Sequence, residues 1–203
     1  MQRKRFQFTS IIEWGTLLIT TGLVCFFLVL ILWEIIFQGA GSLSWSFISE
    51  VPREGMTKGG ILTPILGTVL LTLLTALFSI PFGVCCAIYL NEYAEDNWLT
   101  KTIRAAIRNL SGVPSIIYGL FGLALFVQAL QLGTSMLSAG LTLGLLSLPY
   151  IITTTEEALM RIPASTREAA LAVGATKLET IKDVVLPSAM PGILTGVVLT
   201  LSR

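Results

Sequence analysis

The chain has 203 residues, of which 54% are hydrophobic and only 12% charged, about half the charged fraction of roughly 25% found in soluble domains. A soluble fold of this length could not bury so much apolar surface, which excludes a soluble enzyme and a disordered chain. The net charge of +1 gives no bulk attraction for nucleic acid, and the absence of histidine removes the commonest general base and metal ligand.

Long apolar runs predict membrane-spanning helices, since about 20 apolar residues cross a bilayer. In chain order the runs are Trp14 to Trp33, Ile61 to Leu90, Leu110 to Leu132, Met136 to Thr155, and a fifth that begins near Ala189. The first run follows a basic N-terminus but is too long for a signal peptide, so we expect a retained anchor. The second run is longer than the bilayer core is thick, so it must tilt, bend or overhang, and Pro81 and Gly83 are the obvious places for a bend. The predicted fold class is an all-α polytopic membrane protein.

Basic residues predict the orientation of these spans, because Lys and Arg are retained on the cytoplasmic side. Ten of the thirteen fall on one side of an alternating topology, and only Arg53 and Lys58 fall in the opposite loops. The ten are Arg3, Lys4, Arg5, Lys101, Arg104, Arg108, Arg161, Arg167, Lys177 and Lys182. The sequence therefore predicts a cytoplasmic N-terminus.

Hydroxyl side chains recur along one face of the second span, at Thr68, Thr72, Thr75 and Ser79. They could line a polar substrate pathway, or they could bond a neighbouring helix or the carbonyl four residues earlier. Small residues at two further places indicate close helix packing within a bundle. These are Ser115, Gly119 and Gly122 in the third span, and the GxxxG pair Gly140 and Gly144 in the fourth.

Spans two to four contain no ionisable Asp, Glu, Lys, Arg or His residue. A proton-coupled carrier or an intramembrane protease would need such groups, so we expect no catalytic residue and an energy source outside this subunit. Arg203 is the one charge within a predicted span and would suit contact with an anion or an acidic partner. The cysteines, Cys25, Cys85 and Cys86, lack ligand-like spacing, so we expect neither disulfides nor a metal site.

The link between the second and third spans has amphipathic helical spacing. Its apolar face is predicted to contain Leu99, Ile103 and Ile107, and its basic face Lys101, Arg104 and Arg108. We expect this helix to lie along the inner membrane surface, in contact with lipid.

The longer link, residues 156–187, predicts a bent and capped helical element. Pro163 should end the helix that continues the fourth span. Ser165 with Glu168, and Thr176 with Glu179, have capping-box spacing. The resulting rigid element suits docking to a partner, although a hairpin on the membrane surface would have the same pattern.

Between the two boxes, Gly174 is placed to close the first helix in a left-handed cap. The second helix should then present one apolar face, formed by Leu178, Ile181, Val184 and Val185.

Seven residues of this link resemble the EAA motif of ABC importer permeases, with valine at the usual isoleucine position. They are Glu168, Ala169, Ala170, Gly174, Val184, Leu186 and Pro187. The resemblance implies a type I ABC importer permease fold, in which the segment from Glu168 to Gly174 is a coupling helix seated in a cleft of an ATPase subunit.

Further runs resemble the phosphate permeases of the PstA type across most of residues 59–203. They include GGILTPILGTVLLT, AIYLNEYA, GVPSIIYGLFG, TTEEAL and LPSAMPGILTG. The resemblance implies a multi-pass permease in the cytoplasmic (inner) membrane of a prokaryote. Its partners would be a second permease of the PstC type, two ATPase subunits of the PstB type, which bind ATP and Mg²⁺, and an external phosphate-binding protein of the PstS type.

The resemblance divides the chain into residues 1–60, with the first span and an external loop, and residues 61–203, an ABC importer transmembrane domain. Such permeases continue beyond the position of Arg203 into a sixth span, so we expect a C-terminally truncated chain with four full spans and the start of a fifth. Sulfate, molybdate or phosphonate remain alternative cargoes. A stand-alone channel or carrier, or a structural scaffold, would leave the capped link unexplained.

Overall fold

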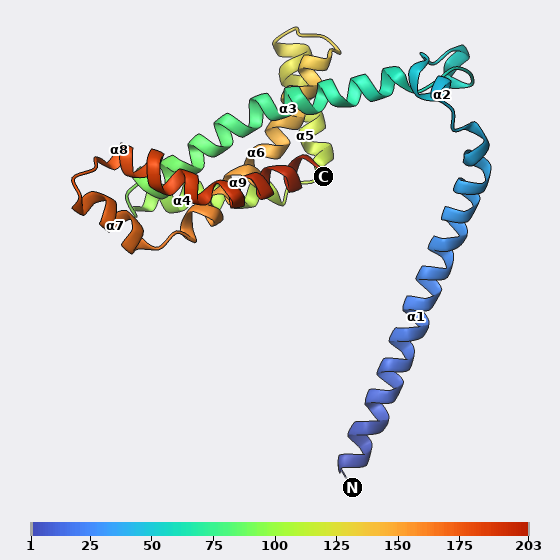
Figure 1. Ribbon diagram of the computed structural model, residues 1–203, viewed down its shortest axis with the longest axis horizontal. Coiled ribbons are helices and arrows are strands. Elements are labelled where there is room, and N and C mark those ends of the chain that lie inside the picture. Colours follow the sequence, from blue (N-terminus) through green and yellow to red (C-terminus); the bar gives the residue numbers. More distant parts are fainter. Residues whose placement is uncertain (1, 203) are drawn as a thin grey trace. The chain divides into compact units, whose positions relative to one another are not determined.

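The computed structural model describes the backbone of residues 2–202 and the side chains of residues 13–202, and no β-strand occurs within these ranges. The chain forms the α-helices shown in Figure 1, linked by 3-10 and π-helical segments. The α-helices are α1 (Gln2–Gly39), α2 (Trp45–Ser49), α3 (Leu62–Ile88), α4 (Trp98–Ser111), α5 (Ser115–Gly122), α6 (Met136–Met160), α7 (Ala164–Ala172), α8 (Lys177–Glu179) and α9 (Leu186–Leu201). The π-helical segments are η3 (Tyr89–Tyr93), η4 (Leu123–Ala129) and η5 (Thr180–Val185).

Four helical stretches are long and apolar enough to cross a membrane, which confirms four of the predicted spans. They are Glu13–Ser42, Leu62–Tyr93, Met136–Met160 and Lys177–Leu201. A fifth candidate is a bent pair, α4 with Ser115–Ala129, whose two parts meet at 100°.

The predicted third span, Leu110 to Leu132, was wrong at its start. Leu110 and Ser111 belong to α4, and Pro114 precedes a new helix that begins at Ser115. Proline disfavours helical backbone in the residue before it, so the apolar run is divided although its hydropathy is continuous. The stretch Ser115–Ala129 is also shorter than the roughly 20 residues that cross a bilayer upright.

In the second span, α3 continues without a break through Pro81 and Gly83 and passes into η3 at Tyr89. The last span was also predicted to start too late. Helical backbone is continuous from Lys177 through η5 into α9, so the second helix of the link and the last span are one element.

The chain divides into two compact units between Ile65 and Leu66. In the first unit, the apolar side chains of α1 from Trp14 onward are exposed, which suits a helix surrounded by lipid. The loop after α1 is closed by backbone bonds, with Ile61 N–H donating to the Phe47 carbonyl at 2.8 Å and Leu62 N–H to Glu50 at 3.2 Å. At Gly60 a side chain would collide with the Phe47 carbonyl, so this closure requires glycine.

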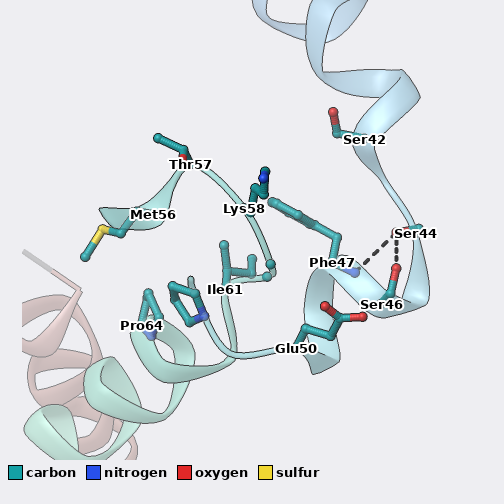
Figure 2. Close-up of a pocket in the computed structure, with 13 residues that line it drawn as sticks. Ser42, Ser44, Ser46, Phe47, Glu50, Met56, Thr57, Lys58, Ile61 and Pro64 are labelled. Atoms are coloured by element: carbon teal, nitrogen blue, oxygen red, sulfur yellow. Dashed lines mark hydrogen bonds between the residues drawn. The ribbon is translucent and has the colours of Figure 1, made fainter. Parts of the chain in front are cut away.

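A cavity of about 390 Å³ lies in this loop (Figure 2). One side of the cavity is lined by Phe47 of α2 and by the two residues that flank this helix, Ser44 and Glu50. The other side is lined by Met56 and Lys58 of the returning chain. The hydroxyl of Ser44 accepts the Phe47 N–H at 3.2 Å and so caps α2. The loop is therefore an ordered element.

The core of the second unit forms where α6 packs against α9 and α3. Ile151 and Leu159 of α6 are buried with Val185, Ala189, Ile193 and Val197 of η5 and α9. Gly192 of α9 brings the two helices together, since a Cβ there would lie 2.9 Å from the Ala158 Cβ. Small residues thus permit close backbone approach, as expected of a membrane helix bundle.

The predicted GxxxG pair, Gly140 and Gly144 of α6, packs against α3. A Cβ at Gly140 would lie 2.8 Å from the Leu74 Cβ, and one at Gly144 2.5 Å from Phe78 Cδ1. The stripe in the third span is only partly a packing face, because Gly122 lies against Thr142 while Gly119 has no neighbour within 4 Å of its Cβ position.

Candidate functional site

The α7 helix begins directly after Pro163, at Ala164. The backbone of Pro163 is extended, with φ −60° and ψ 146°, and no side chain caps the helix. The predicted capping box of Ser165 with Glu168 was therefore wrong. An N-cap residue needs non-helical backbone, whereas Ser165 already lies inside the helix.

A glycine corner ends α7 as predicted. Gly174 has φ +91°, in the left-handed region that favours glycine. Its N–H donates to the Leu171 carbonyl at 3.0 Å, and the Ala175 N–H donates to the Ala170 carbonyl at 3.2 Å. This pair of bonds is a Schellman motif, which fixes the direction in which the chain leaves α7.

The predicted capping box of Thr176 with Glu179 is confirmed. The Thr176 hydroxyl accepts the Glu179 N–H at 3.3 Å, and the Glu179 carboxylate accepts the Thr176 N–H at 2.8 Å. The corner between α7 and α8 is thus held from both sides.

Replacing Thr176 with alanine should weaken this corner. We expect the free energy of unfolding to fall by about 1 kcal/mol, the usual cost of losing an N-cap hydroxyl. Denaturant titration of the purified protein measures the change, with Thr166→Ala, in the body of α7, as the control. Equal stability of the two variants would contradict the assigned role.

The segment from α7 to α8 presents apolar side chains to the outside. Leu171, Val173 and Leu178 are 49%, 87% and 67% exposed. Glu168 and Ala169, at the centre of α7, are exposed too, and Ala170 is half-buried. Three large apolar residues around one capped corner form a surface that a partner could cover.

The predicted apolar face of the second helix is divided between two environments. Ile181 and Val185 are buried in the core, Val184 is half-buried, and Leu178 is exposed. The division follows the elements, because α8 has no buried residue whereas Ile181 and Val185 lie in η5, which packs on the core. Leu186 packs against the core cluster and Pro187 is exposed near the start of α9.

A largely buried ion pair joins α7 to η3, the π-helical segment that follows α3. Arg167 Nη2 lies 2.7 Å from Glu92 Oε1, and the two side chains are 22% and 8% exposed. The same guanidinium donates to the Leu159 carbonyl at 3.0 Å and to the Ile162 carbonyl at 2.7 Å, at the C-terminal end of α6. Arg167 thus joins three elements.

A second buried ion pair, Arg104 with Glu156, joins α4 to α6 at 3.0 Å. Arg104 Nη2 also donates to the Leu90 carbonyl of η3 at 2.5 Å. One residue departs from the predicted faces of α4, because Arg104 of the predicted basic face is half-buried against Glu156. Leu99 and Ile103 of the predicted apolar face are exposed, and Ile107 is buried. The cost of burying a guanidinium is met here by a carboxylate and a carbonyl.

Lys177 adds a third contact to η3, with its ammonium 4.9 Å from the centre of the Tyr93 ring. Residues 90–93 are therefore contacted by a cation from each of α4, α7 and α8.

Sequence reasoning used Arg167 as a marker of orientation and Arg104 also as part of a basic helix face, and it did not predict the pairing of either with Glu92 or Glu156. One signal was available. Both acids directly follow long uncharged runs, where a carboxylate needs a partner.

The hydroxyl face of α3 does not have one environment along its length. Thr75 and Ser79 are buried, while Thr68 and Thr72 are exposed. The Thr72 hydroxyl donates to the Thr68 carbonyl at 2.8 Å, and that of Ser79 to the Thr75 carbonyl at 2.7 Å. These bonds match the alternative in which the hydroxyls bond the preceding helical turn, and the pathway role stays a prediction. Arg203 lies outside the described residues.

No group of three or more metal-ligating side chains is assembled within the described part of the chain, and its cysteines are unpaired.

A family model described as "Binding-protein-dependent transport system inner membrane component" matches residues 79–203, more than half of the chain. The chain belongs to this family. It is thus a multi-pass inner-membrane permease, and its all-α type I importer fold is as predicted. The fold is shared with the MetNI methionine ABC transporter, with a TM-score of 0.63 at 24% identity over 70% of this chain and 68% of that one.

Two curated relatives show what else the permease is similar to. The probable ABC transporter permease protein YqgI of Bacillus subtilis is 36% identical over 169 residues, covering 83% of this chain and 58% of YqgI. The phosphate transport system permease protein PstA of Yersinia pestis is 34% identical over 179 residues, covering 88% of this chain and 60% of PstA. The chain therefore spans less than two thirds of the length of these relatives.

Proposed function

We propose that this permease is a subunit of an ATP-driven importer of inorganic phosphate. Similarity to PstA proteins supports the cargo, with 34% identity to that of Yersinia pestis and 33% to PstA 1 of Mycobacterium tuberculosis. In this proposal a second permease of the PstC type encloses the pathway together with this chain. An external binding protein of the PstS type delivers phosphate, and hydrolysis of ATP occurs on two subunits of the PstB type.

The observation that carries the coupling role is the exposed apolar corner formed by Leu171, Val173 and Leu178. A Schellman motif and a capping box fix the backbone of this corner, so the corner can move as a rigid unit when a bound partner moves. We infer that α7 sits in a cleft of the ATPase subunit. Glu168, Ala169 and Ala170 would face the cleft, and Gly174, Val184, Leu186 and Pro187 would set the path back into the bundle.

In this mechanism, ATP binding closes the ATPase dimer, α7 moves with it, and the bundle switches from inward to outward access. Each arrangement is a discrete packing state, so ATP drives the switch only through its different affinity for the two. The N-terminus is cytoplasmic in the proposal, which the one-sided distribution of basic residues supports.

The phosphate pathway is proposed to follow the part of α3 that carries Thr68 and Thr72, whose side chains are exposed. Thr75 and Ser79 continue this face toward the core, and Arg203 would supply the positive charge that an oxyanion needs.

Competition between oxyanions tests the cargo. With the assembled transporter in vesicles, uptake of labelled phosphate should fall with excess unlabelled phosphate and persist in equal excesses of sulfate, molybdate or phosphonate. Inhibition by sulfate as strong as that by phosphate would assign the permease to another oxyanion. Uptake that survives removal of the ATPase subunits would instead indicate a channel or carrier.

A further inference from the structure

Three cationic side chains contact η3, the segment that follows α3. Within residues 90–93, the Leu90 carbonyl accepts from Arg104, the Glu92 carboxylate pairs with Arg167, and the Tyr93 ring lies beneath Lys177. The three cations come from α4, α7 and α8. Two of them, Arg167 and Lys177, stand on either side of the glycine corner.

Arg167 is the strongest of these contacts. Its Nε lies 3.2 Å from each Glu92 carboxylate oxygen and its Nη2 2.7 Å from Oε1, so the pair is bidentate. The remaining donors of the guanidinium reach the Leu159 and Ile162 carbonyls. Only a planar fork with several donors satisfies a carboxylate and two carbonyls at once, which a lysine ammonium cannot reproduce in this geometry.

Arg167 lies next to the outward-facing part of α7. It directly precedes Glu168, so the residue that faces outward and the residue that holds η3 are neighbours on the same short helix. Breaking a buried pair by removing one partner leaves an uncompensated charge. Movement of α7 is therefore opposed unless η3 and the end of α6 move with it.

We propose that the Glu92–Arg167 pair is the link through which displacement of α7 reaches α3 and α6, with Arg167 as a positioning residue. The inference rests on the proposed coupling role of α7. In this proposal, α7 moves α3, which carries the hydroxyl face, through the contact with η3. The covalent connection from α6 to α7 through residues 161–163 is not sufficient to transmit the displacement to α3.

The functional test compares Glu92→Gln, Arg167→Gln and the double variant in the assembled transporter. Each single variant should lower the phosphate imported per ATP hydrolysed by at least about fivefold, the lower range of typical coupling between sites, while the ATPase subunits still co-purify. The double variant should be no worse than either single one, because the two residues act as a unit. Arg167→Lys should rescue little.

Asp96→Asn is the matched control, since it removes an ion pair with Lys101 that is exposed on both sides. It should leave the ratio of import to hydrolysis unchanged. Additive losses in the double variant, or normal ratios in both single variants, would overturn the link.

A distance measurement separates this inference from the proposed function. Spin labels at Tyr89→Cys in η3 and Ser165→Cys in α7, both exposed, are introduced after Cys25, Cys85 and Cys86 are replaced by serine. The label separation should be narrow and equal in the nucleotide-free and ATP-bound transporter, and Arg167→Gln should broaden it even without nucleotide. A distribution that Arg167→Gln leaves unchanged refutes the link, whether or not the transporter carries phosphate.

Discussion

Replacing Gly174 with proline should reduce phosphate-stimulated ATP hydrolysis by at least about tenfold, equivalent to 1.4 kcal/mol of lost coupling, while the protein still reaches the membrane. Proline fixes φ near −65°, whereas Gly174 has φ +91°. Proline also lacks the N–H that reaches the Leu171 carbonyl. The corner would open and change the direction in which the chain leaves α7 toward α8. Hydrolysis by the assembled transporter in the presence of the phosphate-loaded binding protein measures the effect.

Gly174→Asn is the control for this prediction. No atom lies within 4 Å of a Cβ at Gly174, so a side chain has room and only the backbone conformation matters. Asparagine enters the left-handed region more readily than other residues with a Cβ, and this variant should retain most of the stimulated hydrolysis. Normal stimulation in Gly174→Pro would remove the corner from the coupling mechanism.

Gly83→Leu should prevent the second unit from packing. A Cβ at Gly83 would lie 2.6 Å from Ile151 Cγ2, and Ile151 is fully buried in the α6–α9 core. Overpacking a close-packed interior usually costs about 1–3 kcal/mol, and a whole leucine at a helix crossing requires α3 to separate from α6. We expect most of the variant to be lost as aggregate, and the remainder to unfold at a lower temperature.

Gly119→Leu is the matched substitution, because nothing lies within 4 Å of a Cβ there. It should be recovered in normal yield as an isolated subunit, measured by size-exclusion chromatography in detergent. Equal recovery of the two variants would show that α3 and α6 are not in close contact at Gly83.

Much of the fold could be predicted because it depends on local properties. An uncharged run of about twenty residues is long enough to cross a bilayer, so four of the spans could be predicted from hydropathy. Gly174 and the Thr176–Glu179 box were predictable for the same reason, since each is decided by a few neighbouring residues. Ser165 shows the limit, because Pro163 two residues earlier already started the helix and left that hydroxyl inside it.

The contacts that join the elements were not predictable in this way. Glu92 and Arg167 are 75 residues apart, and no periodicity relates them. Arg104 departs from the predicted basic face of α4 because it pairs with a buried carboxylate, Glu156, on another helix. Charge near a span end predicts a partner but does not say which one, and that choice depends on how the helices cross.

The π-helical segment η5 also determines the phase of the last span. Buried residues recur every four positions there, at Ile181, Val185, Ala189, Ile193 and Val197. In a regular α-helix of 3.6 residues per turn, a spacing of four residues advances the stripe by about 40° at each step, and the steps within α9 do so. The wider turn of the π-helical segment η5 offsets this rotation for the step from Ile181 to Val185. The extra residue in η5 thus sets the angle at which everything before it, including the capped corner, projects from the bundle.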